Sequence, residues 1–140
     1  MKTLFKNNYQ EILLHPELGI FEQRFLPASQ DLFGDDYIRE VSIFGETIQK
    51  NQSDENPYPN LIVNTLNGGP TMEPKVQEFM HAEFYPMIFD AGIRTKAYCL
   101  GDEILSKLSV ELTAENDPNS KFKYKFFANL EEGMDWLRNQ

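Results

Sequence analysis

The sequence has little of what marks secreted, membrane-spanning or nucleic-acid-binding proteins. Its single cysteine, Cys99, cannot form an internal disulfide bond. No apolar run approaches the roughly 20 residues that cross a bilayer, and the first residues lack the apolar core of a secretory signal. The 13 basic residues face 22 acidic ones, and a net charge of -9 disfavours binding to nucleic acid or to anionic membranes. We therefore expect a soluble, acidic, cytoplasmic protein with no nucleic-acid partner and no stable membrane insertion.

The chain does contain enough apolar sequence for one ordinary domain. Its 140 residues are 41% hydrophobic and include 11 Phe. This composition is typical of a globular chain and differs from the low hydrophobicity of disordered ones. A chain of this length can also bury a core of normal size. We expect a single domain over residues 1–140.

The N-terminal third predicts a hairpin followed by a helix. Residues 12–14 and 20–25 are short apolar runs around a Pro/Gly turn, which favours two antiparallel strands. Apolar side chains then recur at helical spacing, and Asp35 or Asp36 can cap that helix. The members of this stripe are Tyr37, Val41, Phe44 and Ile48. The polar residues 51–59, with two prolines, predict a mobile loop after it.

A central strand and a long helix are predicted next. Residues 61–63 form a short β-branched run that is typical of a strand covered on both faces. The helix that follows has Thr71 as its predicted N-cap. Its apolar stripe comprises Val76, Phe79, Met80, Phe84, Met87 and Ile88. Because Pro86 removes a backbone donor and clashes with the preceding turn, we expect a kink or break near residues 83–85.

The last third continues this alternation. Residues 94–100 predict a strand, residues 102–112 a helix, and residues 121–127 a strand at the sheet edge with one lysine-bearing face. A final helix begins at Asn129, which forms a capping-box pattern with Glu132. The order ββαβαβαβα predicts an α/β fold: a mainly parallel five-stranded sheet with an antiparallel N-terminal hairpin strand and helices on its faces.

Several marks in the second half resemble a known family. They are Phe84-Tyr85-Pro86 closing a helix, Ala91-Gly92-Ile93-Arg94 entering a strand, Ala97, and the closing run Phe127-Ala128-Asn129-Leu130-Glu131-Glu132-Gly133-Met134-Asp135-Trp136-Leu137. Together with the layout of the whole chain, they resemble the SpoIIAA-like group of small bacterial proteins, relatives of STAS domains and of the CRAL-TRIO lipid-transfer fold. The resemblance implies a STAS-like domain with a regulatory or binding role.

The resemblance also indicates where a phosphorylation switch would lie. A STAS switch protein carries a phosphorylatable serine, typically after an aspartate, at the N-terminus of the helix that follows the central strand. Here the corresponding residues 64–71 contain no Asp-Ser pair. Thr65 and Thr71 supply the hydroxyl groups, in a setting that departs from the family's motif. They are the phospho-acceptor candidates that the resemblance implies.

The same turn is a candidate ligand or anion site. Asn67, Gly68, Gly69 and Thr71 lie between the predicted central strand and the predicted helix. Glycines before a helix expose backbone N–H groups and the helix dipole to an anion. The structural alternative is a tight strand-to-helix turn, because the sequence has neither a Walker lysine nor a full glycine fingerprint.

The helix after that turn carries more apolar surface than one narrow stripe can bury. Phe79, Phe84, Tyr85 and Met87 are the members of this surplus. It fits a pocket for a small apolar or lipid-like ligand, or a homodimer interface. Plain core packing is the alternative.

No set of residues converges on a catalytic or metal site. Cys99 lies in a predicted strand, where burial favours the inert thiol. His15 and His81 are far apart and lack the i, i+4 partner of a metal-binding helix. We therefore expect no metal and no cofactor, and a non-enzymatic regulatory or protein-interaction module. The alternatives are an apolar-ligand-binding protein and, third, a small enzyme with His81 or Cys99 in an open cleft.

Overall fold

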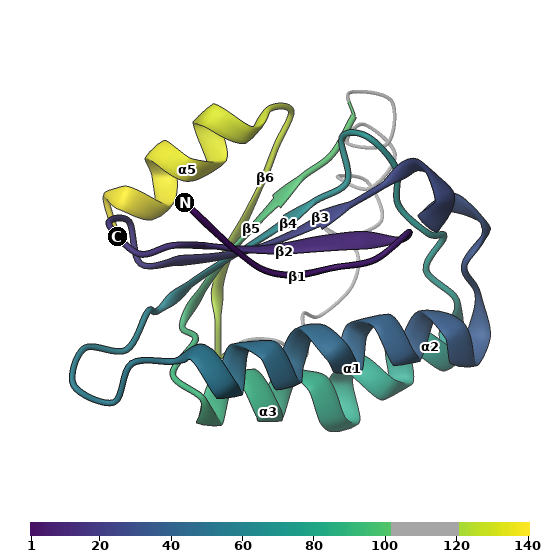
Figure 1. The fold of residues 1–140 in the computed structure, drawn as a ribbon, viewed down its shortest axis with the longest axis horizontal. Helices are drawn as coiled ribbons and strands as arrows, with labels where there is room; N and C mark the ends of the chain where they lie inside the picture. The colour runs from purple at the N-terminus through teal and green to yellow at the C-terminus, as the bar shows by residue number, and fades with distance from the viewer. Residues whose placement is uncertain (102–120) are drawn as a thin grey trace.

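The computed structural model describes residues 1–101 and 121–140 (Figure 1). Their sheet has six strands in the order β1-β2-β3-β4-β5-β6. The bounds are β1 Lys2–Lys6, β2 Gln10–His15, β3 Ile20–Phe25, β4 Asn60–Asn64, β5 Thr95–Cys99 and β6 Lys123–Phe127. The predicted helix over residues 102–112 lies outside the described residues.

The strand directions confirm the predicted α/β fold. The β1–β2 and β2–β3 pairs are antiparallel, and the remaining pairs are parallel. As expected, β4 is central, and β6 is the outermost strand on its side of the described sheet.

The sheet has six strands where the sequence predicted five, and the addition is β1. This strand pairs only with β2 and carries lysine at both ends. Its apolar residues, Leu4 and Phe5, are only half-buried. A short edge strand of this kind lacks the alternation of buried and exposed side chains by which strands are recognised.

Helix α1, Gly34–Asn51, buries the predicted stripe of Tyr37, Val41, Phe44 and Ile48. Its N-cap is Phe33, and the prediction that Asp35 or Asp36 caps it was wrong. Both aspartates lie inside the first turn, where they favour the helix through its dipole. The first N–H group, that of Gly34, donates instead to the carboxylate of Glu73.

The second helix runs through α2 (Pro74–Phe79), the π-helical segment η2 (Met80–Phe84) and α3 (Tyr85–Asp90). Its N-cap is Glu73, so the prediction of Thr71 was wrong: the chain stays extended until Pro74, whose missing N–H suits the first turn. The predicted break has the form of the π segment, where Tyr85 N–H donates to Met80 O. Pro86 follows within the first turn of α3, where its missing donor is tolerated.

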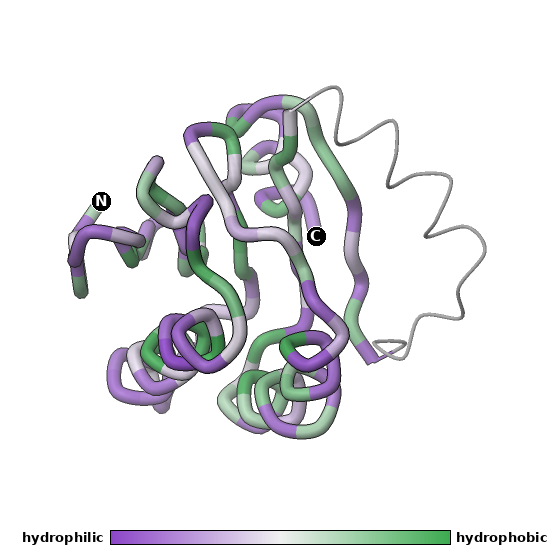
Figure 2. The backbone as a smooth tube through the Cα atoms, turned by 90° about the vertical axis from the view of Figure 1, so that its right-hand side faces the viewer, coloured by the Kyte–Doolittle hydropathy of each residue, from purple (hydrophilic) through white to green (hydrophobic). Residues whose placement is uncertain are grey.

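Helix α1 and the α2–α3 helix cover one face of the sheet, and α5 (Leu130–Arg138) covers the other (Figure 1). The two crossovers, β3 to β4 and β4 to β5, step in the same direction across the sheet. Because such crossovers are right-handed, both helices lie on the same face. Figure 2 views them end-on, side by side below the sheet. The predicted cap of α5 is confirmed, since Glu132 N–H donates to Asn129 Oδ1 at 2.8 Å.

A buried polar network joins α1 to the hairpin. Gln10 Nε2 donates to the backbone oxygen of Glu40 at 2.9 Å and to its Oε1 at 3.1 Å. Gln23 Nε2 donates to Gln10 Oε1 at 2.9 Å, and Asn7 Nδ2 donates to Glu40 Oε1 at 2.7 Å. These bonds offset the cost of burying the amides and carboxylate, and they fix the position of α1 along the strands.

Candidate functional site

A buried carboxylate forms the most polar cluster on the α5 face of the sheet. Glu22 of β3 is fully buried. Its Oε1 lies 2.9 Å from His15 Nε2 and 3.1 Å from Arg24 Nη2. Its Oε2 accepts hydrogen bonds from Arg24 Nε at 2.8 Å and from Asn64 Nδ2 at 3.1 Å. The four side chains come from β2, β3 and β4, so the cluster exists only in the assembled sheet.

The surroundings of Glu22 keep it charged. Burial raises the pKa of its carboxyl, but the hydrogen bonds from His15, Arg24 and Asn64, with the charge of Arg24, outweigh burial and lower the pKa overall. The hydrogen bond to Glu22 in turn raises the pKa of Arg24. Because an ionised carboxylate only accepts, His15 holds a proton on Nε2.

In this cluster the His15 imidazole is held in one orientation by Glu22, and the charges of Glu22 and Arg24 cancel. Within the part of the chain that the structure describes, the hydrogen bonds among these four side chains involve no hydroxyl or thiol. Among the described residues, His15 thus makes no side-chain hydrogen bond to a nucleophile. The sequence did contain one signal for the cluster: Glu22 and Arg24 are two apart on a strand and so share a face.

The Asn67 to Thr71 turn lies at the carboxyl ends of the parallel strands. Gly68 N–H donates weakly to Thr65 O at 3.5 Å, and a Cβ on Gly68 would lie 2.5 Å from Leu26 O. The turn is therefore packed against the chain that follows β3. Since α2 begins only at Pro74, the turn and the helix N-terminus are separate features. Ligand or anion binding by Asn67, Gly68, Gly69 and Thr71 stays a prediction.

The two threonines proposed as phospho-acceptors differ in their surroundings. The Thr65 hydroxyl donates to Cys99 O at 2.9 Å and is half-buried. Thr71 is exposed on the extended chain before α2. A kinase would reach Thr71 more readily, and phosphorylation of either residue stays a prediction.

The surplus apolar residues of the second helix contact the core to different degrees. Phe84 is buried and stacks on Phe44, with ring centroids 6.1 Å apart. Met87 packs over Gly45 of α1. Phe79 and Tyr85 are half-buried at the margin of the same core. The apolar pocket and the dimer interface predicted for these residues remain predictions.

Cys99 and His81, the enzyme candidates, lie on separate elements. Cys99 is fully buried on β5, and burial first, then the charge of Glu22, raises the pKa of its thiol to about 12. His81 is half-buried on η2, where its ring lies 5.5 Å from that of Tyr85. Within the described ranges, no hydrogen bond or ring contact joins the two residues.

Large apolar side chains are exposed near the starts of the two neighbouring helices. Phe33 is 69% exposed and Met72 is 45% exposed. Each lies just before a helix, and the Gly34 N–H to Glu73 bond and the Lys75–Asp35 ion pair (2.7 Å) join the two helix starts. Leu66, 36% exposed, lies on the same connection as Met72. We call Phe33, Leu66 and Met72 the carboxyl-edge surface.

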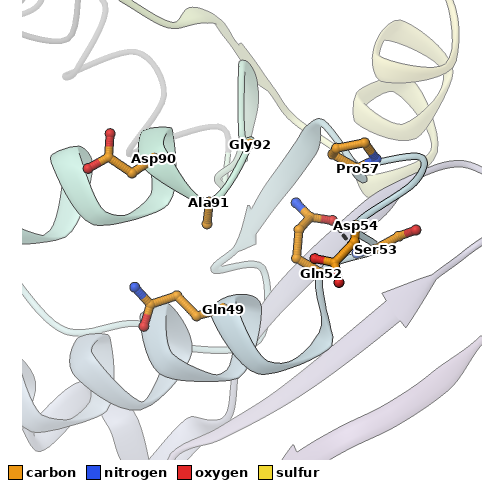
Figure 3. A pocket seen from close by; sticks show the side chains of 8 residues that line it. All are labelled: Gln49, Gln52, Ser53, Asp54, Pro57, Asp90, Ala91 and Gly92. Carbon is orange, nitrogen blue, oxygen red and sulfur yellow. Dashed lines mark hydrogen bonds between the residues drawn. The ribbon is translucent and has the colours of Figure 1, made fainter.

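An open depression of about 430 Å³ lies at the opposite end of the helices (Figure 3). It is lined by Gln49, Gln52, Ser53, Asp54, Pro57, Asp90, Ala91 and Gly92. Gln52 ties the predicted mobile loop together, because its Oε1 accepts from Tyr58 N–H at 2.6 Å and its Nε2 donates to Tyr58 O at 2.9 Å. The only carboxylates of the lining belong to Asp54 and Asp90, both exposed. They indicate a weakly negative surface.

Comparison with known proteins identifies no relative of this chain. No family model, curated protein or solved structure matches this chain. Membership of the SpoIIAA-like group therefore stays a prediction. Within residues 1–101 and 121–140, no helix is both long and apolar enough to span a bilayer, and no three metal-binding side chains come together.

Proposed function

We propose that this protein is a non-enzymatic protein-interaction module that binds a partner through the carboxyl-edge surface. The observation that carries the proposal is the joint exposure of Phe33, the N-cap of α1, and Met72, the residue before the N-cap of α2, where the two helices start side by side. Exposed aromatic and methionine side chains are enriched where proteins bind one another. The resemblance in layout to SpoIIAA-like regulatory proteins supports the same role.

The charges around this surface indicate the chemistry of the partner. Asp31, Asp35 and Asp36 are exposed beside Phe33, and two of them make ion pairs, Asp35 with Lys75 and Asp36 with Arg39. An apolar centre with an acidic rim is complementary to an apolar side chain flanked by lysine or arginine. We therefore expect a partner protein whose contact surface is apolar at its centre and basic at its margin.

Site-specific photo-crosslinking in the producing cell tests this proposal. A benzophenone amino acid at position 33 should cross-link one defined protein, which is then purified and titrated against the module. The matched control carries the same group at Lys50, exposed at the other end of α1. Replacing Phe33 and Met72 by Ser should weaken the reconstituted complex at least about tenfold.

Two results would count against the proposal. One is cross-linking at position 33 that is no more selective than cross-linking at position 50. The other is a reconstituted complex whose affinity the Phe33→Ser, Met72→Ser variant leaves unchanged while its circular dichroism matches that of the parent. If the cross-linked species is a second copy of this chain, the carboxyl-edge surface is a homodimer interface and not a binding site for a different protein.

A further inference from the structure

Four basic side chains gather along the β6 edge of the sheet. Arg94 lies just before β5, and Lys121, Lys123 and Lys125 follow one another along β6 and the residues that precede it. Lys123 N–H donates to Arg94 O at 3.1 Å, which places the start of β6 beside Arg94. All four side chains are exposed. We call them the basic ridge.

The basic ridge makes no ion pair with the carboxylates that the structure describes. Within the described residues, none of its four side chains has a carboxylate oxygen within 4.0 Å. The other arginines, by contrast, all make ion pairs, with Glu22, Asp36, Glu40 and Asp135. In residues 1–101 and 121–140 of a chain with 22 acidic and 13 basic residues, these four cations thus make no ion pair. Such a cluster is a local positive field on an acidic protein.

Aromatic rings hold several of these cations in place. The Arg94 guanidinium lies 3.8 Å from the ring centroid of Phe89, and Lys121 Nζ lies 5.4 Å from the same centroid. Lys125 Nζ lies 5.6 Å from the ring of Phe127. These contacts fix the side chains over apolar surface while the charges remain in water. Arg94, Lys121 and Lys125 are therefore positioned over aromatic rings before any anion arrives.

The spacing of the ridge matches an extended peptide. Lys123 and Lys125 occupy alternate positions of one strand, so they project from one face about 7 Å apart. Alternate side chains of another extended chain have the same repeat. Among the described strands, β6 is the outermost on this side, and an extended segment that adds to a sheet does so along its outermost strand.

We propose that the basic ridge binds an acidic segment of another protein in extended conformation. Carboxylates at alternate positions of that segment pair with Lys123 and Lys125 on the α5 face of the sheet. A carboxylate at an intervening position, which projects to the other face, pairs with Arg94 or Lys121 beside Phe89 of α3 at the amino end of β6. The observations favour this occupant over nucleic acid, because a net charge of -9 repels a long polyanion more than a short acidic segment. They disfavour edge pairing between copies, since β1 also carries lysines.

Fluorescence anisotropy with a synthetic peptide tests the proposal. The probe is a fluorescein-labelled peptide of about eight residues that alternates Glu and Thr, and its control has Gln in place of Glu. The Lys121→Gln, Lys123→Gln, Lys125→Gln variant should bind the Glu peptide about tenfold more weakly than the parent. The matched control, Lys2→Gln, Lys6→Gln, Lys50→Gln, removes the same charge from exposed positions elsewhere and should keep most of the affinity.

Arginine replacements separate charge from folding. The Lys121→Arg, Lys123→Arg, Lys125→Arg variant keeps every cation and should bind the Glu peptide within about twofold of the parent. Equal weakening by the two glutamine variants, or equal binding of the Glu and Gln peptides, would overturn the proposal. So would tighter lysine-dependent binding of an oligothymidylate or of phosphatidylserine vesicles, both measured at the same ionic strength.

Discussion

Arg24 donates a hydrogen bond to each oxygen of the buried Glu22 carboxylate, from Nε at 2.8 Å and from Nη2 at 3.1 Å. This two-point contact fixes both the distance and the plane of the pair. It lies on a strand that is hydrogen-bonded on both sides, by β2 and by β4. Because the Glu22 carboxylate is fully buried, losing its hydrogen-bond donors would destabilise the part of the sheet formed by β2 and β3.

Replacing Glu22 by Gln should destabilise the protein by about 2–3 kcal/mol. The substitution leaves the charge of Arg24 without its counterion and places an amide donor against other donors. This loss of stability is smaller than that for a fully buried unpaired charge, because the Arg24 side chain is 26% exposed to water. Urea unfolding followed by circular dichroism measures it. Glu17→Gln, in the exposed hairpin turn, should change stability by less than about 0.5 kcal/mol, and an equal loss in both variants would refute this reading.

The contribution of Glu22 should also depend on pH. Because the folded protein lowers the pKa of this carboxyl below its ordinary value of 4.5, its stabilisation is present above about pH 4.5 and is lost as the pH falls through the folded pKa. The difference in urea midpoint between the parent and Glu22→Gln should therefore be constant above about pH 5 and shrink below it. A difference in urea midpoint that persists unchanged to pH 3 would contradict the lowered pKa of the Glu22 carboxyl.

Much of the fold could be predicted because its helices and inner strands have clear periods. The apolar stripe of α1 reflects the burial of one face of the helix. The continuous apolar run of β4 reflects the burial of both faces of the strand. The errors arose where the signal depends on the rest of the fold. Asp35 and Asp36 suit a cap and a first turn equally well, and only the approach of Glu73 decides between them. Pro74 was an available signal for the start of α2, since proline favours the first helical turn.

The candidate site was harder to predict than the fold. The cluster around Glu22 needs three neighbouring strands in register, and pairing between strands cannot be read from one sequence. The exposure of Phe33 and Met72 runs against the rule that large apolar residues are buried. The lysines of β6 were visible as an edge feature, but their contacts with Phe89 and Phe127 depend on packing.

Cys99 should be unreactive in the folded protein. Raising the pKa of its thiol from 9.0 to about 12 lowers the thiolate fraction about a thousandfold at neutral pH, and burial also blocks access. Labelling by a chromogenic disulfide reagent should therefore follow the rate of unfolding. Complete labelling in concentrated urea is the positive control. Prompt labelling of the native protein would show that β5 is open to solvent at this position.

Gly133 of α5 lies next to the sulfur atom of Cys99. A Cβ at this position would lie 3.0 Å from Cys99 Sγ, 3.5 Å from Phe127 Cδ2 and 3.7 Å from Ala97 Cβ. In an unobstructed helix, alanine is more stable than glycine by about 1 kcal/mol. Here the sulfur belongs to a fully buried residue on an inner strand and has little room to move. Gly133→Ala should therefore destabilise the parent protein by about 1 kcal/mol through overpacking.

Removing the sulfur should reverse the sign of that effect. In a Cys99→Ala background, Gly133→Ala gains its helical preference without the clash and should stabilise the protein by about 1 kcal/mol, relative to Cys99→Ala alone. The two substitutions thus couple by about 2 kcal/mol in a double-mutant cycle of urea unfolding. Ile62→Val, in the same cluster but absent from the close contacts of Gly133, should combine additively with Gly133→Ala. Additivity with Cys99→Ala as well would mean that a neighbour other than the sulfur excludes the methyl group.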